Sequence, residues 1–324
     1  MNAHRTPAGR GGILCVGQIV ADVVIRPVDR LPHPGRLEVL EDFDLVPGGC
    51  ACNTACVLAK LGARVSVIGL IGKDALGEAI LGPVADTGVN VELVRKSPGT
   101  RTTAVVVIVA GNGERSFLYR PGGNELFANE MVPDEALAAN EIVHVGGAMK
   151  LAGLDFAGLL GRAKRSGCLT TLDTDWDSAG RWLGLIGPAM PFIDHFITNE
   201  EEGSRLTGKE GAEAIARALL ALGPPHVIVK MGERGSLHAS RAGLFRFPGF
   251  PVKVVDTTCA GDAFVAGYLL GIIKGLGTGE RMALGNAAGA LCTTAVSHRG
   301  VESLDQAVSI IRSHPDLYPM IKGL

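Results

Sequence analysis

The chain has few aromatic residues and no excess of charge of either sign. Aromatic side chains make up 5% of its 324 residues, and 31 lysines and arginines oppose 33 aspartates and glutamates, for a formal net charge of −2. Such a chain lacks the basic surface on which nucleic acids and anionic membranes bind, so we expect small-molecule partners instead. The hydrophobic fraction of 47% supports a substantial core. We expect one large α/β domain over residues 1–324.

Long apolar runs are also missing. The first apolar stretch, from residue 13, is interrupted by Gly17, Gln18 and Asp22, which makes it a poor signal-peptide core. No later stretch is long enough to span a bilayer. Residues 1–12 are predicted to form a flexible tail. The seven cysteines, an odd number without Cys-x-x-Cys spacing, fit a reducing compartment, so we expect a cytoplasmic protein.

Two common nucleotide-binding motifs are absent. A Walker-type loop needs Gly-x-x-x-x-Gly-Lys followed by Ser or Thr, but residues 72–74 and 208–210 place Asp or Glu after the lysine. A dinucleotide-binding turn needs Gly-x-Gly-x-x-Gly after the first strand, whereas residues 13–17 lead into Gln-Ile-Val-Ala-Asp. Both classes of protein are therefore excluded.

The most informative stretch is residues 256–262, Asp-Thr-Thr-Cys-Ala-Gly-Asp, followed by an apolar helical pattern from residue 263. Small residues before a helix let backbone N–H groups converge on an anion, and the helix N-terminus adds partial positive charge. A carboxylate there would repel a phosphate, so Asp262 is predicted to take a proton from an attacking hydroxyl. A plain helix cap is the alternative reading.

A second glycine-rich segment lies far upstream. Residues 48–55 read Gly-Gly-Cys-Ala-Cys-Asn-Thr-Ala before a helical pattern, with Gly62 and Gly72 downstream. The glycines allow close backbone approach, and Asn53 offers a donor and an acceptor to a polyhydroxy ligand.

Together the two segments resemble the signatures of the ribokinase-like, or pfkB, family of carbohydrate kinases. The stretch Asn-Glu-Glu-Glu at 199–202 is similar to the family's Asn-x-x-Glu element, and residues 229–235 are similar to a strand and turn beside its nucleotide site. The resemblance implies a ribokinase-like three-layer αβα sandwich with a mostly parallel central sheet and a small β-sheet lid. It also implies ATP-dependent phosphorylation of a sugar hydroxyl, expected to be primary, with Mg²⁺, and a homodimer formed through the lid.

Periodicity agrees with an alternating α/β chain. Predicted core strands are residues 13–17, 65–69, 142–145, 169–173, 195–198 and 227–230. Predicted helices are residues 54–61, 75–87, 156–165, 212–222, 263–274, 280–295 and 303–313. Two β-branched segments, about 23–46 and 100–120, lack helical periodicity and are predicted to form the lid; an extension of the main sheet is the alternative.

The resemblance assigns the catalytic roles residue by residue. Asp262 is the general base, and the backbone N–H groups of Ala260, Gly261 and Asp262 form the anion hole. Cys259 stands where the family usually has glycine, so the turn must accommodate its Cβ. Asp256 orients either the turn or a substrate hydroxyl.

For the acceptor, the resemblance points to Asp22 and Asn53, with Gly49 allowing the backbone to approach the sugar. Val20 and Cys50 replace polar substrate contacts of ribokinase, which argues against D-ribose. Four further side chains on or beside the lid either bind an anionic substrate group or are solvated: Arg101, Arg115, Tyr119 and Arg120.

For ATP and Mg²⁺, the resemblance assigns Asn199 and Glu202 to the metal, through water, although their spacing also makes a helix capping box. The remaining candidates at the nucleotide are Lys230, Gly232, Gly235 and Asn286. Asp173, Asp175 and Asp177 follow a strand and could support the metal. A K⁺ site is implied around residues 297–300. Alternative functions are a nucleoside kinase of the same family and a non-catalytic sugar or nucleotide sensor.

Overall fold

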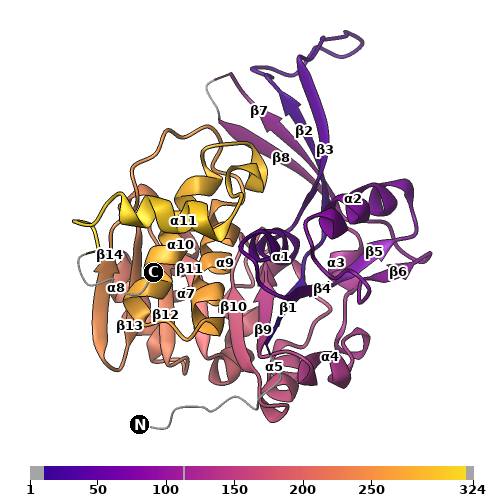
Figure 1. Ribbon diagram of the computed structural model, residues 1–324. Coiled ribbons are helices and arrows are strands. Elements are labelled where there is room, and N and C mark those ends of the chain that lie inside the picture. Colours follow the sequence, from indigo (N-terminus) through magenta and orange to yellow (C-terminus); the bar gives the residue numbers. More distant parts are fainter. Residues whose placement is uncertain (1–10, 112–113, 319–324) are drawn as a thin grey trace.

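The computed structural model describes residues 11–111 and 114–318, so all but the last two residues of the tail predicted at 1–12 lie outside the described part. Its main sheet has eight strands in the order β14-β13-β12-β11-β10-β9-β1-β4 (Figure 1). From β12 to β4 all neighbours are parallel, while β13 and β14 are antiparallel additions at one edge. The strands are β1 Ile13–Gly17, β4 Val65–Ile68, β9 Ile142–Gly146, β10 Leu169–Asp173, β11 His195–Asn199, β12 His226–Lys230, β13 Ser236–Ser240 and β14 Gly243–Phe247.

Helices cover both faces of this sheet. In β1, Ile13 and Cys15 join one apolar cluster and Leu14 and Val16 the other, because successive side chains of a strand point to opposite faces. The first cluster is completed by α1 Cys50–Lys60, α2 Ala75–Asp86, α9 Ala260–Ile273, α10 Thr278–Cys292 and α11 Leu304–Arg312. The second is completed by α4 Asp134–Ala138, α5 Phe156–Arg165, α6 Leu183–Ile186, α7 Glu200–Thr207 and α8 Ala212–Leu220. The predicted three-layer sandwich is confirmed.

Four strands form a separate small sheet, as predicted, and are not an extension of the main sheet. They are β2 Val20–Arg26, β3 Asp42–Gly48, β7 Ala104–Val109 and β8 Arg115–Arg120, in the order β3-β2-β7-β8. Figure 1 shows the small sheet projecting from one end of the molecule. Part of the turn between β7 and β8, residues 112–113, lies outside the described residues.

Shorter elements complete the fold. The pair β5 Leu70–Gly72 and β6 Arg95–Ser97 forms its own sheet, beside α3 Gly123–Leu126. The chain separates β4 from β5 at Gly69, where a Cβ would lie 2.4 Å from the carbonyl oxygen of Gly17. The 3₁₀ helices of the described residues are η1 Asn129–Met131, η2 Ala148–Lys150, η3 Gly187–Phe192, η4 Gly232–Arg234 and η5 Ser297–Gly300. Among the residues described, no helix combines the length and apolar character needed to cross a membrane.

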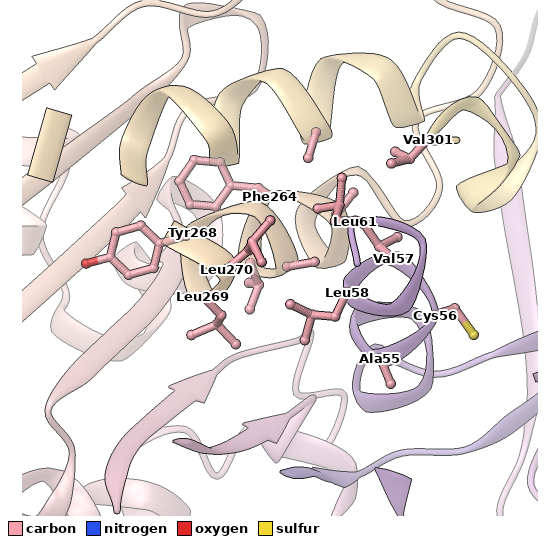
Figure 2. Packing of buried hydrophobic residues seen from close by; sticks show 14 of the residues in the cluster. Ala55, Cys56, Val57, Leu58, Leu61, Phe264, Tyr268, Leu269, Leu270 and Val301 are labelled. Carbon is pink, nitrogen blue, oxygen red and sulfur yellow. The ribbon is translucent and has the colours of Figure 1, made fainter. Parts of the chain in front are cut away.

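The packing of α1 against α9 places their two N-termini at the same end of the sheet. Figure 2 shows Leu58 of α1 pointing toward α9, whose Leu269 and Leu270 belong to the same group of buried side chains. These side chains are buried within one cluster. Both helices begin earlier than predicted, at Cys50 and Ala260, so Asn53 and Asp262 each lie in a first helical turn.

Candidate active site

Most of the backbone N–H groups at the N-terminus of α9 have no hydrogen-bond acceptor among the described residues. Cys259, the residue before the helix, has φ 62° and ψ 1°, the left-handed region in which a Cβ costs about 1–2 kcal/mol. The amide of Ala260 makes a long bond of 3.4 Å to the carbonyl of Thr257. The amides of Gly261 and Asp262 find no acceptor in the part of the chain that the structure describes. The turn therefore offers two open amides, with Ala260 partly engaged.

Asp262 is held between α9 and α1. Asn53 Nδ2 donates to Asp262 Oδ2 at 2.8 Å, and the thiol of Cys50 also donates to the carboxylate. Burial, followed by the negative charge of Asp173, raises the pKa of Asp262 from 3.8 to about 7, against the opposing hydrogen bond from Asn53. A carboxylate with this pKa is suited to accept a proton near neutral pH. Asn53 Oδ1 is buried and has no partner among the described residues.

A buried ion pair lies beside this turn. Lys230 ends β12 and Asp173 ends β10, and Lys230 Nζ donates to Asp173 Oδ1 at 2.9 Å. Burial disfavours the ammonium, but Asp173 and Glu202 outweigh it and raise the pKa of Lys230. A Cβ at Gly261 would lie 3.1 Å from Lys230 Nζ, so the glycine leaves room for the ammonium next to the open amides.

Asn199 and Glu202 form half of the predicted capping box. Asn199 Oδ1 accepts from the amide of Glu202 at 2.8 Å and caps α7. The Glu202 side chain does not close the box, since its Oε2 accepts from Thr174 Oγ1 at 2.6 Å. Burial raises the pKa of Glu202 to about 7, although Lys230 opposes this shift. Capping therefore explains Asn199 but not the buried carboxyl of Glu202.

Asp22 and Asp256 line a different space, a cavity of about 50 Å³ between the small sheet and the turn before α9. The carboxylate of Asp22 forms no hydrogen bond with a described residue, and burial raises its pKa to about 7. A Cβ on Gly48 would lie 2.0 Å from Asp22 Oδ2, so that glycine makes room for the carboxylate. Asp262 and Asn53 do not line this cavity. The thiol of Cys259, a half-buried residue, is close enough to both Asp22 and Asp262 for each to raise its pKa, with Asp262 having the greater effect of the two and desolvation exceeding both.

Three candidate glycines have structural explanations. Gly49 has φ 92°, and a Cβ there would lie 2.6 Å from the carbonyl oxygen of Gln18. Gly235 has φ 87° and would place a Cβ 2.0 Å from the carbonyl oxygen of Phe247, whereas Gly232, at φ 61°, has open space around it. Of these, only Gly232 leaves room for a neighbouring ligand.

Asn286 is occupied within the protein. Its Nδ2 donates to Tyr318 Oη at 2.7 Å and to the carbonyl of Pro248 at 3.2 Å, and its Oδ1 accepts from Ser236 at 3.0 Å. These bonds hold a wall of the fold, so the contact to the nucleotide that the resemblance implied finds no support in this geometry.

Two further aspartates and Arg120 also have partners, whereas the buried Tyr119 Oη has none among the described residues. Asp175 accepts from Gln18 Nε2 at 2.9 Å and from the amide of Met149 at 2.7 Å. Asp177 accepts from the amides of Ala179 and Trp182. Arg120 donates to the carbonyl of Thr102 at 2.7 Å. Asp175 and Asp177 therefore hold loops, and no trio of His, Cys, Asp or Glu within the described ranges could enclose a metal ion.

Sequence reasoning missed two contacts at the site. The Asp173–Lys230 pair could have been inferred, because both residues end parallel strands that flank β11. The Cys50 thiol beside Asp262 carried no signal, since its contact depends on how α1 packs on α9.

Comparison with known proteins identifies the family of the chain. The model of the pfkB family carbohydrate kinase matches residues 11–303. A fructokinase of Klebsiella pneumoniae is 32% identical over 286 residues, covering 83% of this chain and 91% of that protein. Ribokinase of Arabidopsis thaliana, solved with ribose and ATP, superposes with a TM-score of 0.80 at 24% identity over 94% of this chain and 99% of that one. A putative ribokinase II of E. coli, solved with ATP and Mg²⁺, gives 0.83 at 20% identity over 94% and 100%. The chain therefore belongs to the pfkB family of carbohydrate kinases.

Proposed function

We propose that this carbohydrate kinase transfers the terminal phosphoryl group of ATP to a primary hydroxyl of a sugar, with Asp262 as the general base. The observation that carries the proposal is a buried carboxyl with a pKa of about 7 in the same helical turn as two open amides. A plain helix cap would not need either feature. The amide of Asn53 fixes the orientation of the carboxylate by its 2.8 Å bond.

The chemistry follows from these positions. Asp262 accepts the proton of the acceptor hydroxyl as the hydroxyl oxygen bonds to the γ-phosphorus and the bond to the leaving ADP oxygen breaks. The amides of Gly261 and Asp262, with Ala260, donate to the equatorial phosphoryl oxygens. Lys230 is held beside the same amides and adds positive charge there. These donors need little rearrangement as charge develops.

The residues near the nucleotide fit a metal that keeps most of its own waters. The carboxyls of Glu202 and Asp173 share one ammonium, Lys230, so a negative charge is uncompensated when both carboxyls are ionised. Without a cage of protein ligands, Mg²⁺ would be held by ATP phosphates and by waters bonded to Glu202, with Asn199 fixing the start of α7. When bound, it would neutralise charge on the β- and γ-phosphates. Gly232 offers open space beside Lys230 for the nucleotide.

The acceptor is proposed to be a hexose or related sugar. The similarity to a fructokinase supports this, as do Val20 and Cys50, which replace polar contacts expected in a ribokinase. Asp22, with its unpaired carboxylate beside the cavity, is the proposed partner of a second sugar hydroxyl. The side chain of Asn53 is proposed to accept another through its unpaired Oδ1.

An acceptor screen tests this function. The protein is incubated with ATP and Mg²⁺ against D-fructose, other hexoses, pentoses, sugar acids, sugar phosphates and nucleosides, and ADP is measured. We expect a sugar to give the highest kcat/KM. Preference for a nucleoside would move the chain to nucleoside kinases, and ligand binding without turnover across the panel would favour a sensor.

We also propose that two copies pair through the small sheet. Paired strand residues share a face, and the register aligns Val23 and Ile25 with Leu45 and Phe43 on one side of β2. On the other side of β2, Val23 and Ile25 align with Val106 and Ile108 of β7. Val106 in turn aligns with Leu118 of β8. Phe43 is 66% exposed and Leu118 60%, on the face opposite the cavity. An exposed apolar face of this extent is typical of an interface.

Light scattering after gel filtration tests the dimer. Phe43→Glu should convert a dimer to a monomer, whereas Leu37→Glu, on an exposed loop outside the sheet, should not. A monomeric wild type would overturn the proposal.

The K⁺ site and the cytoplasmic location remain predictions. In η5, the carbonyl of His298 already accepts from Lys60 Nζ at 2.9 Å, and that of Ser297 from the thiol of Cys292 at 3.3 Å. Replacing K⁺ with tetramethylammonium in the kinase assay tests the site, since loss of activity would support it. All seven cysteines are free thiols, as a reducing compartment would leave them.

A further inference from the structure

One guanidinium group joins the small sheet to the turn before α9. Arg115, the first residue of β8, donates from Nη2 to Thr257 Oγ1 at 2.5 Å and from Nη1 to Thr258 Oγ1. Its Nη1 also lies 3.3 Å from Asp256 Oδ1. All three acceptors precede the left-handed residue Cys259 and the open amides of α9. Arg115 thus links the small sheet directly to the turn before α9.

Asp256 extends this connection to η5. Its Oδ1 accepts from the amide and hydroxyl of Thr258 at 2.9 and 2.7 Å, and its Oδ2 accepts from the amide of Ser297 at 3.1 Å. These bonds and the charge of Arg115 outweigh burial and hold the pKa of Asp256 below its ordinary value. A second, longer pair joins the sheet to η5, with Asp44 Oδ2 3.8 Å from Arg299 Nη2.

Apolar walls surround the same contact. Valines of the small sheet line one side of the cavity and valines of the two loops the other: Val24, Val46, Val107 and Val109 against Val255 and Val296. Valine contacts are not directional, so they leave the sheet free to shift over the loops. The directional bonds of Arg115 define where the sheet stands relative to the turn.

We propose that Arg115 is a positioning residue that couples the small sheet to the N-terminal amides of α9. This rests on the proposed function. The guanidinium binds Thr257, Thr258 and Asp256 and so fixes the turn. The residue that follows, Cys259, has the unfavourable left-handed backbone conformation. Phosphoryl transfer is then fast only when the sheet stands over the acceptor. A displacement of about 1 Å in such a group can cost about 10²-fold in rate.

Arg115→Ala tests the coupling, with Arg162→Ala as the matched control. Arg162 has the same side-chain exposure, 24%, and pairs with Asp134 between α4 and α5, away from the site. We expect Arg115→Ala to lower kcat by about 10- to 100-fold and to change the KM for ATP by less than about 3-fold. Guanidinium chloride at millimolar concentration should restore part of its rate. Arg115→Lys should be intermediate, because an ammonium lacks the fork of donors.

Hydrogen exchange provides a readout that does not depend on turnover. The amides of Thr258 and Ser297, both of which donate to Asp256, should exchange faster in Arg115→Ala than in wild type, and at the wild-type rate in Arg162→Ala. Two results for Arg115→Ala would each overturn the coupling: a kcat within 2-fold of wild type, or unchanged exchange. The coupling would also fail if the loss of rate followed a loss of thermal stability and guanidinium did not restore it. If wild type phosphorylates no acceptor, the proposed function fails, and the exchange rates alone decide the coupling.

Discussion

Asp262→Asn should make the protein more stable, and increasingly so as the pH rises. Burial raises the pKa of Asp262 from 3.8 to about 7. The folded state therefore retains a proton that the unfolded chain releases at lower pH. The stability that this proton contributes is complete below the unfolded pKa and is lost as the pH rises through 7. Asparagine carries no charge and loses nothing over this range.

The size of the effect follows from the two pKa values. One pKa unit corresponds to about 1.4 kcal/mol, so the variant should exceed wild type by about 1.5 kcal/mol at pH 5 and by about 4 kcal/mol at pH 8. Such a gain would mean that the carboxylate is retained for chemistry at a cost in stability. Urea unfolding at pH 5, 6, 7 and 8, without nucleotide or Mg²⁺, measures the difference.

An exposed carboxylate provides the control for this measurement. Asp86→Asn, at the end of α2, should change the free energy of unfolding by less than about 0.5 kcal/mol at every pH. If the advantage of Asp262→Asn stays constant from pH 5 to pH 8, the carboxyl is not held protonated in the fold and the reasoning is refuted.

Three further predictions concern other groups. Glu202→Gln should raise the Mg²⁺ concentration for half-maximal rate by about 10-fold or more, with little change in sugar KM; loss of thermal stability with unchanged Mg²⁺ dependence would favour a capping role instead. Cys259→Gly should keep kcat within about 2-fold of wild type. Cys259→Val should lower the free energy of unfolding by about 1–2 kcal/mol, because a β-branched residue fits poorly at positive φ. Equal free energies of unfolding in urea for Cys259→Val and wild type would contradict this. Burial, then His226, lowers the pKa of His238 from 6.5 to about 4. The unfolded chain therefore binds the proton first, and stability should fall by about 3 kcal/mol between pH 6.5 and pH 4; His238→Gln should flatten that decline in urea titrations, and an unchanged slope would count against it.

Periodicity and glycine placement were enough to predict the parallel core and the separate small sheet. They failed for β13, because Ser236 and His238 are polar yet buried in it. Each contacts a polar partner outside the strand, Ser236 with Asn286 and His238 Nε2 with His226. Such a strand shows no apolar run, and no local pattern reveals the partners.

The site was predictable as residue types but not as contacts. The sequence motifs identify Asn53 and Asp262, yet their hydrogen bond joins residues 209 positions apart and depends on the packing of α1 on α9. Asn286 illustrates the same limit, since the resemblance placed it at the nucleotide but gave no sign of its hydrogen bonds to Tyr318 and Ser236. Hydrogen-bond partners of this kind follow from tertiary packing.

Single-turnover phosphorylation of the best acceptor by Asp262→Asn, at saturating ATP and Mg²⁺, measures whether this carboxylate takes the proton of the attacking hydroxyl. A loss of about 10²- to 10⁴-fold in the phosphorylation rate, with the ATP dissociation constant within about 3-fold of wild type, is the predicted result. A rate near that of wild type would contradict the account.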